Sequence, residues 1–178
     1  YALIALGYTM VYGIITLINF AHGEIFMVGA FVGLALAQYL KVNVFLAIIG
    51  AMLTCMVLGI VVERIAYRPL RRSSRLSALI SAIGVSIFLA TLIQLIRGPQ
   101  TTNYPADIIN NTIYTIGPLH ISKLQLLMIL VSASLMLGLQ LIVKNTRIGK
   151  AMRATSQDYD AASLMGININ QVISFTFA

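Results

Sequence analysis

Residues Val44–Val62, VFLAIIGAMLTCMVLGIVV, form an apolar run without a single charge, and this run indicates the fold class of the chain. As an α-helix it would be about 28 Å long, which is enough to cross the hydrocarbon core of a bilayer. The uncharged runs 76–96 and 124–143 have a similar length. Strands of a membrane barrel are only about half as long, so helices are the structures that satisfy the backbone in lipid here. The pattern predicts an all-α fold with transmembrane helices at these three places.

The composition agrees with a membrane protein. Of the 178 residues, 59% are hydrophobic and only 10% are charged, whereas soluble domains carry about 25% charged residues. We expect one polytopic transmembrane helix bundle, 1–178, that forms a single domain and is truncated at both ends. The single cysteine, Cys55, lies within an apolar run. It has no partner for an intrachain disulfide and is expected to pack as a small core residue.

The basic residues are concentrated in two segments between the apolar runs. These residues are Arg64, Arg68, Arg71, Arg72 and Arg75 in the first segment and Lys144, Arg147, Lys150 and Arg153 in the second. The longer loop 97–123 holds only Arg97 and Lys123. The positive-inside rule places both basic segments in the cytoplasm and this loop outside. The net charge of +7 therefore indicates topology and not nucleic-acid binding.

Arginines at the end of the first long helix are predicted to anchor the chain at the cytoplasmic membrane surface. They are Arg64, Arg68, Arg71 and Arg72. Arginines at this depth bind lipid phosphates. Pro69 is expected to end the helix. Glu63 is expected to pair with Arg64 or with an arginine of the next turn.

The beginning of the chain is apolar but interrupted. Residues 1–18 are long enough for a span, and 25–38 form a shorter, partial segment of about 20 Å. Polar residues separate the two. Two interpretations remain: a broken helix, or a span followed by a re-entrant half-helix, so the fold includes a broken or re-entrant segment near its N-terminus. Irregular backbone at this depth must be packed by protein or line a wet cavity.

Asn19, His22 and Glu24 are therefore candidates for a translocation path. Ionisable residues inside a membrane are costly and usually functional. The alternative is structural, with Asn19 capping a helix and Gly23 permitting the break. Both roles are compatible. A metal site would need more ligands than these, so no metal is expected.

Small local patterns predict further details. Three pairs of small residues at a spacing of four indicate faces for close helix packing: Gly29 and Gly33, Ala78 and Ala82, and Ser134 and Gly138. In the outer loop, Ile113–Ile116 and 119–121 are expected to pair as a short hairpin around a Gly-Pro turn.

The segment from about 150 to 166 is predicted to couple the chain to a cytoplasmic partner. Asp160 lies near the start of a short helix, where a negative charge complements the helix dipole. Ala161, Ala162 and the pair Leu164-Met165 are expected to form a narrow apolar face that fits a groove in that partner. Gly166 is expected to end the helix and turn the chain towards the membrane.

The sequence contains no motif for catalysis. Ile148-Gly149-Lys150 lacks the rest of a phosphate-binding loop, and no nucleophile elbow or zinc-binding His-Glu motif occurs. We expect a transport subunit with no catalytic residue and no cofactor of its own.

Three motifs then point to a family. Asn19-Phe20-Ala21-His22-Gly23-Glu24, Glu63-Arg64-Ile65-Ala66-Tyr67-Arg68-Pro69-Leu70-Arg71 and Ala161-Ala162-Ser163-Leu164-Met165-Gly166-Ile167-Asn168 occur in this order. Together with Leu79-Ile80-Ser81-Ala82-Ile83-Gly84, they resemble the permease subunit of branched-chain amino acid (leucine/isoleucine/valine) ABC importers. In ABC importers the coupling helix follows E-A-A-x3-G-x9-I-x-L-P. Asp160, Ala161, Ala162 and Gly166 match this pattern with Asp for Glu, whereas Thr176 and Ala178 depart from it.

The resemblance implies a set of partners in the bacterial cytoplasmic (inner) membrane. These are a second homologous permease, two cytoplasmic ATPase subunits that bind and hydrolyse ATP, and a periplasmic binding protein that delivers the substrate. Alternatives within the transport class are a permease for urea or short-chain amides, and an ion-coupled secondary transporter or channel that uses His22 and Glu24. A membrane enzyme using the same two residues has no third catalytic group at a matching depth.

Overall fold

The computed structural model describes residues 2–15, 18–41, 43–71, 73–100, 113–116 and 119–178. Helices dominate it, and one two-stranded hairpin lies in the outer loop. The elements in chain order are α1 (Ala2–Ile15), α2 (His22–Tyr39), α3 (Val44–Val62), the π-helical turn η1 (Glu63–Tyr67), the 3-10 turn η2 (Arg68–Leu70), α4 (Arg75–Arg97), β1 (Ile113–Ile116), β2 (Leu119–Ser122), α5 (Lys123–Asn145), α6 (Arg147–Gln157), α7 (Tyr159–Leu164) and α8 (Ile169–Phe177).

Three helices are long and apolar enough to cross a membrane, in agreement with the three predicted runs. Within the described residues they cover Val44–Leu70, Leu76–Arg97 and Lys123–Asn145. The first continues from α3 through η1 and η2, so Pro69 does not end it at the membrane surface but lies in its last turn. The all-α membrane bundle is confirmed, and the chain is a multi-pass membrane protein.

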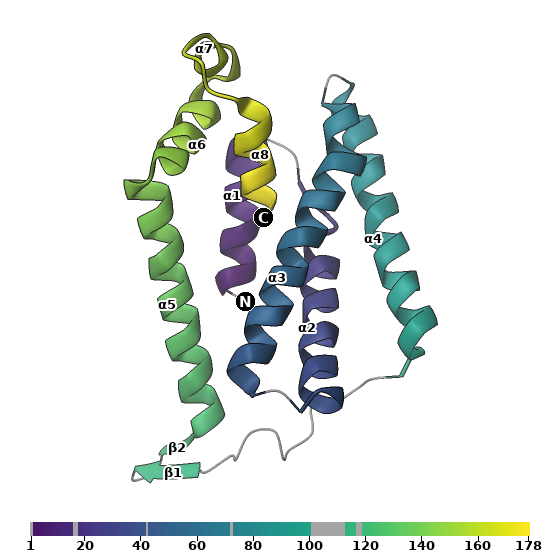
Figure 1. Cartoon of the computed structure of the whole chain (residues 1–178), viewed down its shortest axis with the longest axis vertical. Coiled ribbons are helices and arrows are strands. Elements are labelled where there is room, and N and C mark those ends of the chain that lie inside the picture. The colour runs from purple at the N-terminus through teal and green to yellow at the C-terminus, as the bar shows by residue number, and fades with distance from the viewer. Residues whose placement is uncertain (1, 16–17, 42, 72, 101–112, 117–118) are drawn as a thin grey trace.

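The long helices α3, α4 and α5 extend over most of the height of the molecule (Figure 1). Both basic segments, η1–η2 and α6, lie at the same end, which we call the basic end, together with α7. The hairpin lies at the opposite end (Figure 1). Its strands are antiparallel, with Ile113 opposite Ser122 and Ile116 opposite Leu119, which confirms the predicted strand pairing. The predicted Gly-Pro turn at 117–118 lies outside the described residues.

The chain reverses direction between α1 and α2. Helix α1 rises to the basic end, and α2 runs to the opposite end, where it joins α3 (Figure 1). Helix α2 begins at His22, not at residue 25, and its 18 residues make about 27 Å of helix. His22 and Glu24 therefore lie in its first turn and not in the interruption. The helix begins early because the Asn19 carbonyl accepts a hydrogen bond from the His22 N–H (3.1 Å).

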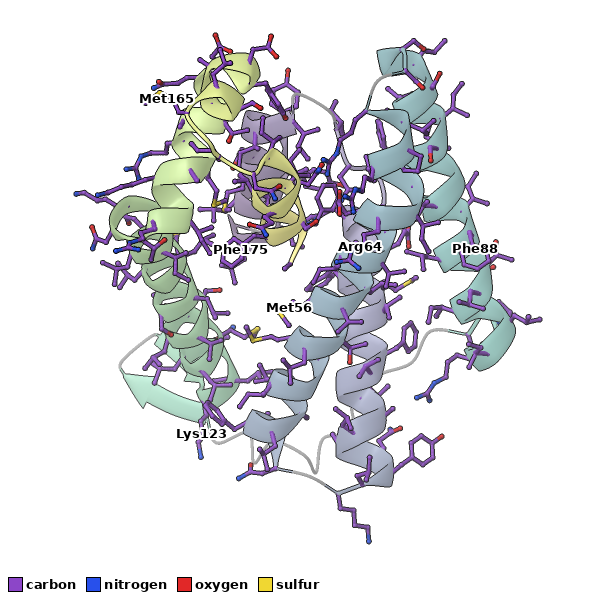
Figure 2. The ribbon with its side chains drawn as sticks, turned by 45° about the horizontal axis from the view of Figure 1, so that its top comes forward. Met56, Arg64, Phe88, Lys123, Met165 and Phe175 are labelled. Atoms are coloured by element: carbon purple, nitrogen blue, oxygen red, sulfur yellow. The ribbon has the colours of Figure 1, made fainter. Side chains whose placement is uncertain are left out.

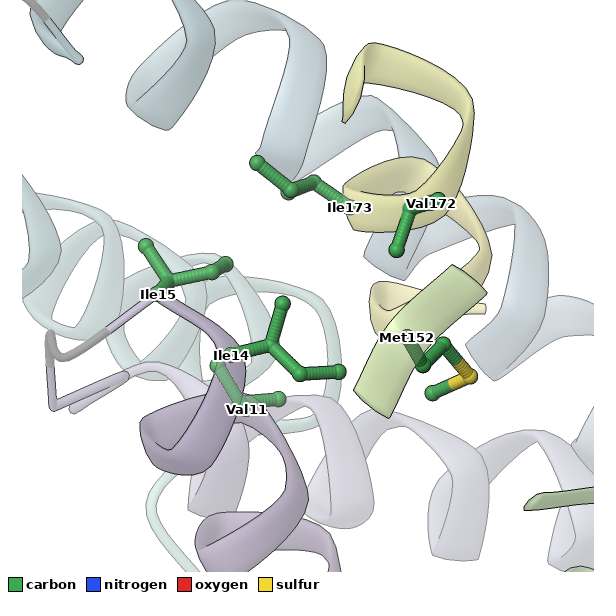
Figure 3. Close-up of a cluster of buried hydrophobic side chains, with 6 residues drawn as sticks. All are labelled: Val11, Ile14, Ile15, Met152, Val172 and Ile173. Carbon is green, nitrogen blue, oxygen red and sulfur yellow. The ribbon is translucent and has the colours of Figure 1, made fainter. Parts of the chain in front are cut away.

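Two buried clusters hold the basic end together. The first joins α1, α6 and α8 through Val11, Ile14, Ile15, Met152, Val172 and Ile173 (Figure 3). The second joins the end of α3 and η1 to α4 through Val62, Ala66, Tyr67 and Ala82, and Phe177 of α8 packs against it. Helix α8 touches both clusters, so the two halves of the basic end meet at this short helix.

Two of the three predicted small-residue faces pack within the chain. Gly29 and Gly33 are buried between α2 and α3, and Ala78 and Ala82 are buried on α4. An added Cβ at Gly138 would meet nothing within 4 Å in the described structure, and Ser134 is exposed. The third face is therefore not a packing face between the described elements.

Replacing Gly29 with leucine is expected to separate α2 from α3, because an added Cβ would collide with the sulfur of Cys55. Overpacking of this kind costs about 1–3 kcal/mol, which corresponds to a fall in melting temperature on the order of 5 °C in detergent. The matched control is Gly84→Leu on α4, where an added Cβ meets nothing within 4 Å. Equal melting temperatures for the two variants would contradict this packing.

Candidate functional site

The predicted docking segment is a short helix that projects from the basic end. Helix α7 follows α6 at Asp158, whose carboxylate accepts hydrogen bonds from the backbone N–H groups of Asp160 (2.8 Å) and Ala161 (2.9 Å). Asp158 is thus the N-cap, and Asp160 lies exposed in the first turn. Both carboxylates complement the positive end of the helix dipole.

Gly166 ends this helix, as its sequence position predicts. Its φ of +81° lies in the left-handed region, which glycine adopts without steric cost. The turn is closed by the N–H of Gly166 on the Ser163 carbonyl (3.0 Å) and the N–H of Ile167 on the Ala162 carbonyl (3.1 Å). This pattern is a Schellman motif, which redirects the chain at a helix end.

The apolar face of α7 differs from the predicted one. Leu164 is 88% exposed and Met165 is 83% exposed, whereas Ala162 is only 4% exposed. Residues two apart on a helix point in nearly opposite directions, so Ala162 faces the chain and Leu164 faces away. The exposed surface therefore consists of Asp160, Ala161, Ser163, Leu164 and Met165, which we call the α7 tip. Met165 lies at its outer edge (Figure 2).

The base of α7 is fastened to the bundle through Tyr159. Its hydroxyl donates a hydrogen bond to the Ile14 carbonyl at the end of α1 (2.5 Å). Burial raises the pKa of the Tyr159 phenol, so the hydroxyl remains a donor even in mildly alkaline solution. The α7 tip is thus an exposed element on a fixed base.

Asn19 and His22 line a central cavity of about 550 Å³ between α1, α2, α3, α5 and α8. Most of its other lining side chains are apolar, including Met10, Val11, Ile25, Met52, Met56, Leu135, Leu139 and Ile142. Glu24 does not join them. Its carboxylate accepts a hydrogen bond from Ser86 of α4 (3.2 Å). The structure therefore brings together Asn19 and His22 but places Glu24 at the interface between α2 and α4.

Asn19 also has a structural role. It is buried, and its side-chain oxygen accepts hydrogen bonds from the Ala21 N–H (3.1 Å) and the Tyr67 hydroxyl (2.9 Å). The ring of His22 packs edge-on against Tyr8, with ring centroids 4.7 Å apart. These contacts stabilise the reversal before α2 while leaving both residues on the cavity wall.

The predicted anchoring arginines have different environments. Arg64 and Arg68 are exposed and line a groove of about 550 Å³ between α3 and α8. Figure 2 labels Arg64 of η1 and Phe175 of α8, which both line this groove. Arg71 instead forms an ion pair with Glu63, which is 0% exposed. Arg72 lies outside the described residues.

The sequence-based prediction for Glu63 was wrong. It paired Glu63 with Arg64 or an arginine of the next turn, whereas the partner in the structure is Arg71. The helix changes to a π-helical turn at Glu63 and a 3-10 turn at Arg68, which carries the chain back so that Arg71 reaches Glu63. The sequence did contain a sign of this pair. Glu63 is a lone carboxylate at the end of an apolar run, and such a group needs a cation beside it when it is buried. No group of three His, Cys, Asp or Glu that could hold a metal occurs within the described ranges.

Comparison with known proteins gives a consistent family. The family model for the branched-chain amino acid transport system permease component matches residues 1–178. The chain is 41% identical over 190 residues to the high-affinity branched-chain amino acid transport system permease protein LivH of Salmonella typhimurium, covering 99% of this chain and 61% of that relative. It is 39% identical to the corresponding permease protein BraD of Pseudomonas aeruginosa, with the same coverage of 99% and 61%.

A more distant relative extends the match to an archaeon. The probable branched-chain amino acid transport permease protein LivH of Methanocaldococcus jannaschii is 24% identical, over 98% of this chain and 56% of the relative. The chain thus spans about three fifths of the length of the curated relatives it matches. No solved structure shows a significant match. With a family model matched along its whole length and relatives near 40% identity, this chain belongs to the family of branched-chain amino acid transport system permease components.

Proposed function

We propose that this chain is the transmembrane permease subunit of an ATP-driven importer, which moves branched-chain amino acids across the bacterial cytoplasmic membrane. The observation that carries the proposal is the α7 tip. Two large apolar side chains, Leu164 and Met165, project from the basic end, where the positive-inside rule places the cytoplasm. Large apolar side chains exposed together on an otherwise polar element are typical of protein interaction sites.

The partner at this tip is a cytoplasmic ATPase, and two such subunits bind and hydrolyse the ATP. A second homologous permease completes the pathway, and a periplasmic binding protein delivers the substrate to the end that carries the hairpin. The chain itself then needs no cofactor. Arg64 and Arg68, exposed at the basic end, hold the bundle in position by binding phosphates of the inner leaflet.

The central cavity supports the choice of substrate class. Its volume of about 550 Å³ lies within the range of small-molecule sites, and its walls are mainly apolar. An aliphatic side chain of leucine, isoleucine or valine would contact the methionines and leucines. Asn19 and His22 offer hydrogen bonds to the charged groups of an amino acid. The names of the relatives agree with this class.

Reconstitution tests the proposal. The full-length permease is placed in proteoliposomes with its second permease and ATPases, and binding protein is added outside. We expect uptake of labelled leucine that requires ATP in the compartment facing the basic end. Gradient-driven leucine uptake by the permease alone would identify a secondary transporter instead. ATP-driven uptake of labelled urea or acetamide, but not leucine, would overturn the substrate class.

A further inference from the structure

We infer that Glu63 and Tyr67 of η1 are positioning residues that link the helix after the docking segment to the wall of the central cavity. The inference rests on the proposed function and deepens it, because it assigns the path by which movement of α7 reaches the cavity. The chain passes from α7 to α8 through Met165–Asn168, which include the turn at Gly166, and the two helices also contact each other. A displacement of the α7 tip therefore acts directly on α8.

Glu63 fastens α8 to η1. One oxygen of its fully buried carboxylate pairs with Arg71, and the other accepts a hydrogen bond from Ser174 of α8 (2.7 Å). Arg71 in turn donates to the side-chain oxygen of Asn170, also on α8 (2.6 Å). A buried carboxylate that loses its cation is strongly destabilised. Helix α8 and η1 are therefore expected to move together and not to slide past one another.

Tyr67 continues the connection to the cavity. Its ring packs against Phe177 of α8, with centroids 5.1 Å apart, and its hydroxyl donates to the side chain of Asn19 (2.9 Å). Asn19 lies on the wall of the central cavity and supports the reversal before α2. The buried side chain of Tyr67 thus contacts both α8, which follows the docking segment, and Asn19 on the cavity wall.

The remaining contacts of η1 make it a firm intermediate. Ser81 of α4 donates a hydrogen bond to the Ala66 carbonyl (3.2 Å), which ties η1 to a long membrane helix. An added Cβ at Gly59 would collide with the carbonyl of Phe177, so α3 and α8 are also in close contact. A π-helical turn within a membrane helix is uncommon and frequently marks a functional position. Movement of α8 is therefore passed on to Asn19 and not absorbed within η1.

The test uses the complete importer in proteoliposomes and measures leucine molecules transported per ATP hydrolysed. Glu63→Gln removes the charge and Tyr67→Phe removes only the hydroxyl. We expect either change to lower this ratio at least fivefold, while ATP hydrolysis per complex stays within twofold. The matched controls are Lys144→Gln, which removes an exposed charge at the basic end, and Tyr12→Phe, an exposed tyrosine of α1. Both should keep the wild-type ratio.

Uptake and ATP hydrolysis are also compared separately, because this comparison distinguishes a loss of coupling from a loss of stability. If the two residues served stability alone, uptake and ATP hydrolysis would fall together and the ratio would be unchanged, which would overturn the inference. Tyr67→Phe keeps the ring on Phe177, so it gives an answer even where Glu63→Gln expresses poorly. Combining Tyr67→Phe with Ser174→Ala should be less than additive if both act on one path. Failure of ATP-driven uptake by the wild type would instead count against the proposed function.

Discussion

Replacing Leu164 and Met165 together with aspartate is expected to reduce ATP-dependent uptake by more than about 100-fold while the protein still inserts in the membrane. Both side chains are exposed in this chain, so their removal leaves no cavity. Burying each against a partner contributes about 1.5–3 kcal/mol. The loss of both, at least about 3 kcal/mol, corresponds to more than 100-fold in affinity. Unpaired carboxylates at the same interface would add to this cost.

The direct measurement is co-purification of the ATPase with the tagged permease, alongside uptake. A matched control places the same two charges at exposed polar positions of the basic end outside the segment 150–166, as Asn145→Asp with Ser73→Asp. We expect this control to keep the ATPase. Normal co-purification and uptake by the Leu164 and Met165 variant would show that the α7 tip is not the docking surface. Ala162→Arg is a poor alternative, because Ala162 is buried and the change would distort α7 itself.

Gly166→Val should have the second largest effect. The positive φ of Gly166 costs a residue with a Cβ about 1–3 kcal/mol, and a β-branched residue fits least well. To relieve this strain, the backbone at residue 166 would leave its left-handed conformation. The turn that orients α7 relative to α8 would then open. We expect uptake and retention of the ATPase to fall at least about tenfold. A misplaced α7 that loses only about 1.4 kcal/mol of binding free energy for the ATPase is sufficient for this effect.

Gly98 offers a control with the same kind of strain at the other end of the bundle. It also has a φ of +81°, and it follows α4 on the side of the hairpin. Gly98→Val should lower the melting temperature without reducing the amount of ATPase that co-purifies. If both glycine variants lost the ATPase equally, the effect would be one of general stability and not of the α7 turn.

Most of the architecture was predictable from local patterns. The apolar runs at 44–62, 76–96 and 124–143 became helices because no other structure satisfies an isolated backbone in lipid. The hairpin at Ile113–Ile116 and the end of α7 at Gly166 followed from turn chemistry, which depends on a few adjacent residues. The roles proposed for Asp160, Ala161 and Gly166 in docking remain predictions.

The errors concern directions of side chains and not the existence of elements. Ala162 was expected on the exposed face but points inward, because the exact start of a six-residue helix sets which side each residue faces. Glu24 was grouped with His22, yet the early start of α2 puts the two on different sides. Arg71 was expected at the lipid surface, and the change of helix type at Glu63 turned it inward.

Three properties follow from the amino-acid sequence: this chain crosses a membrane, its two basic segments share one side, and it belongs to a known permease family. These properties depend on hydrophobic length, on charge distribution and on motifs that are contiguous along the chain. The three-dimensional packing was needed to show that Glu63 pairs with Arg71 and Ser174 and that Tyr67 reaches Asn19. It was also needed to show that Leu164 and Met165 are the exposed pair. The reason is physical: each of these contacts depends on how a helix starts, tightens or widens, and a shift of one residue rotates a side chain by about 100°.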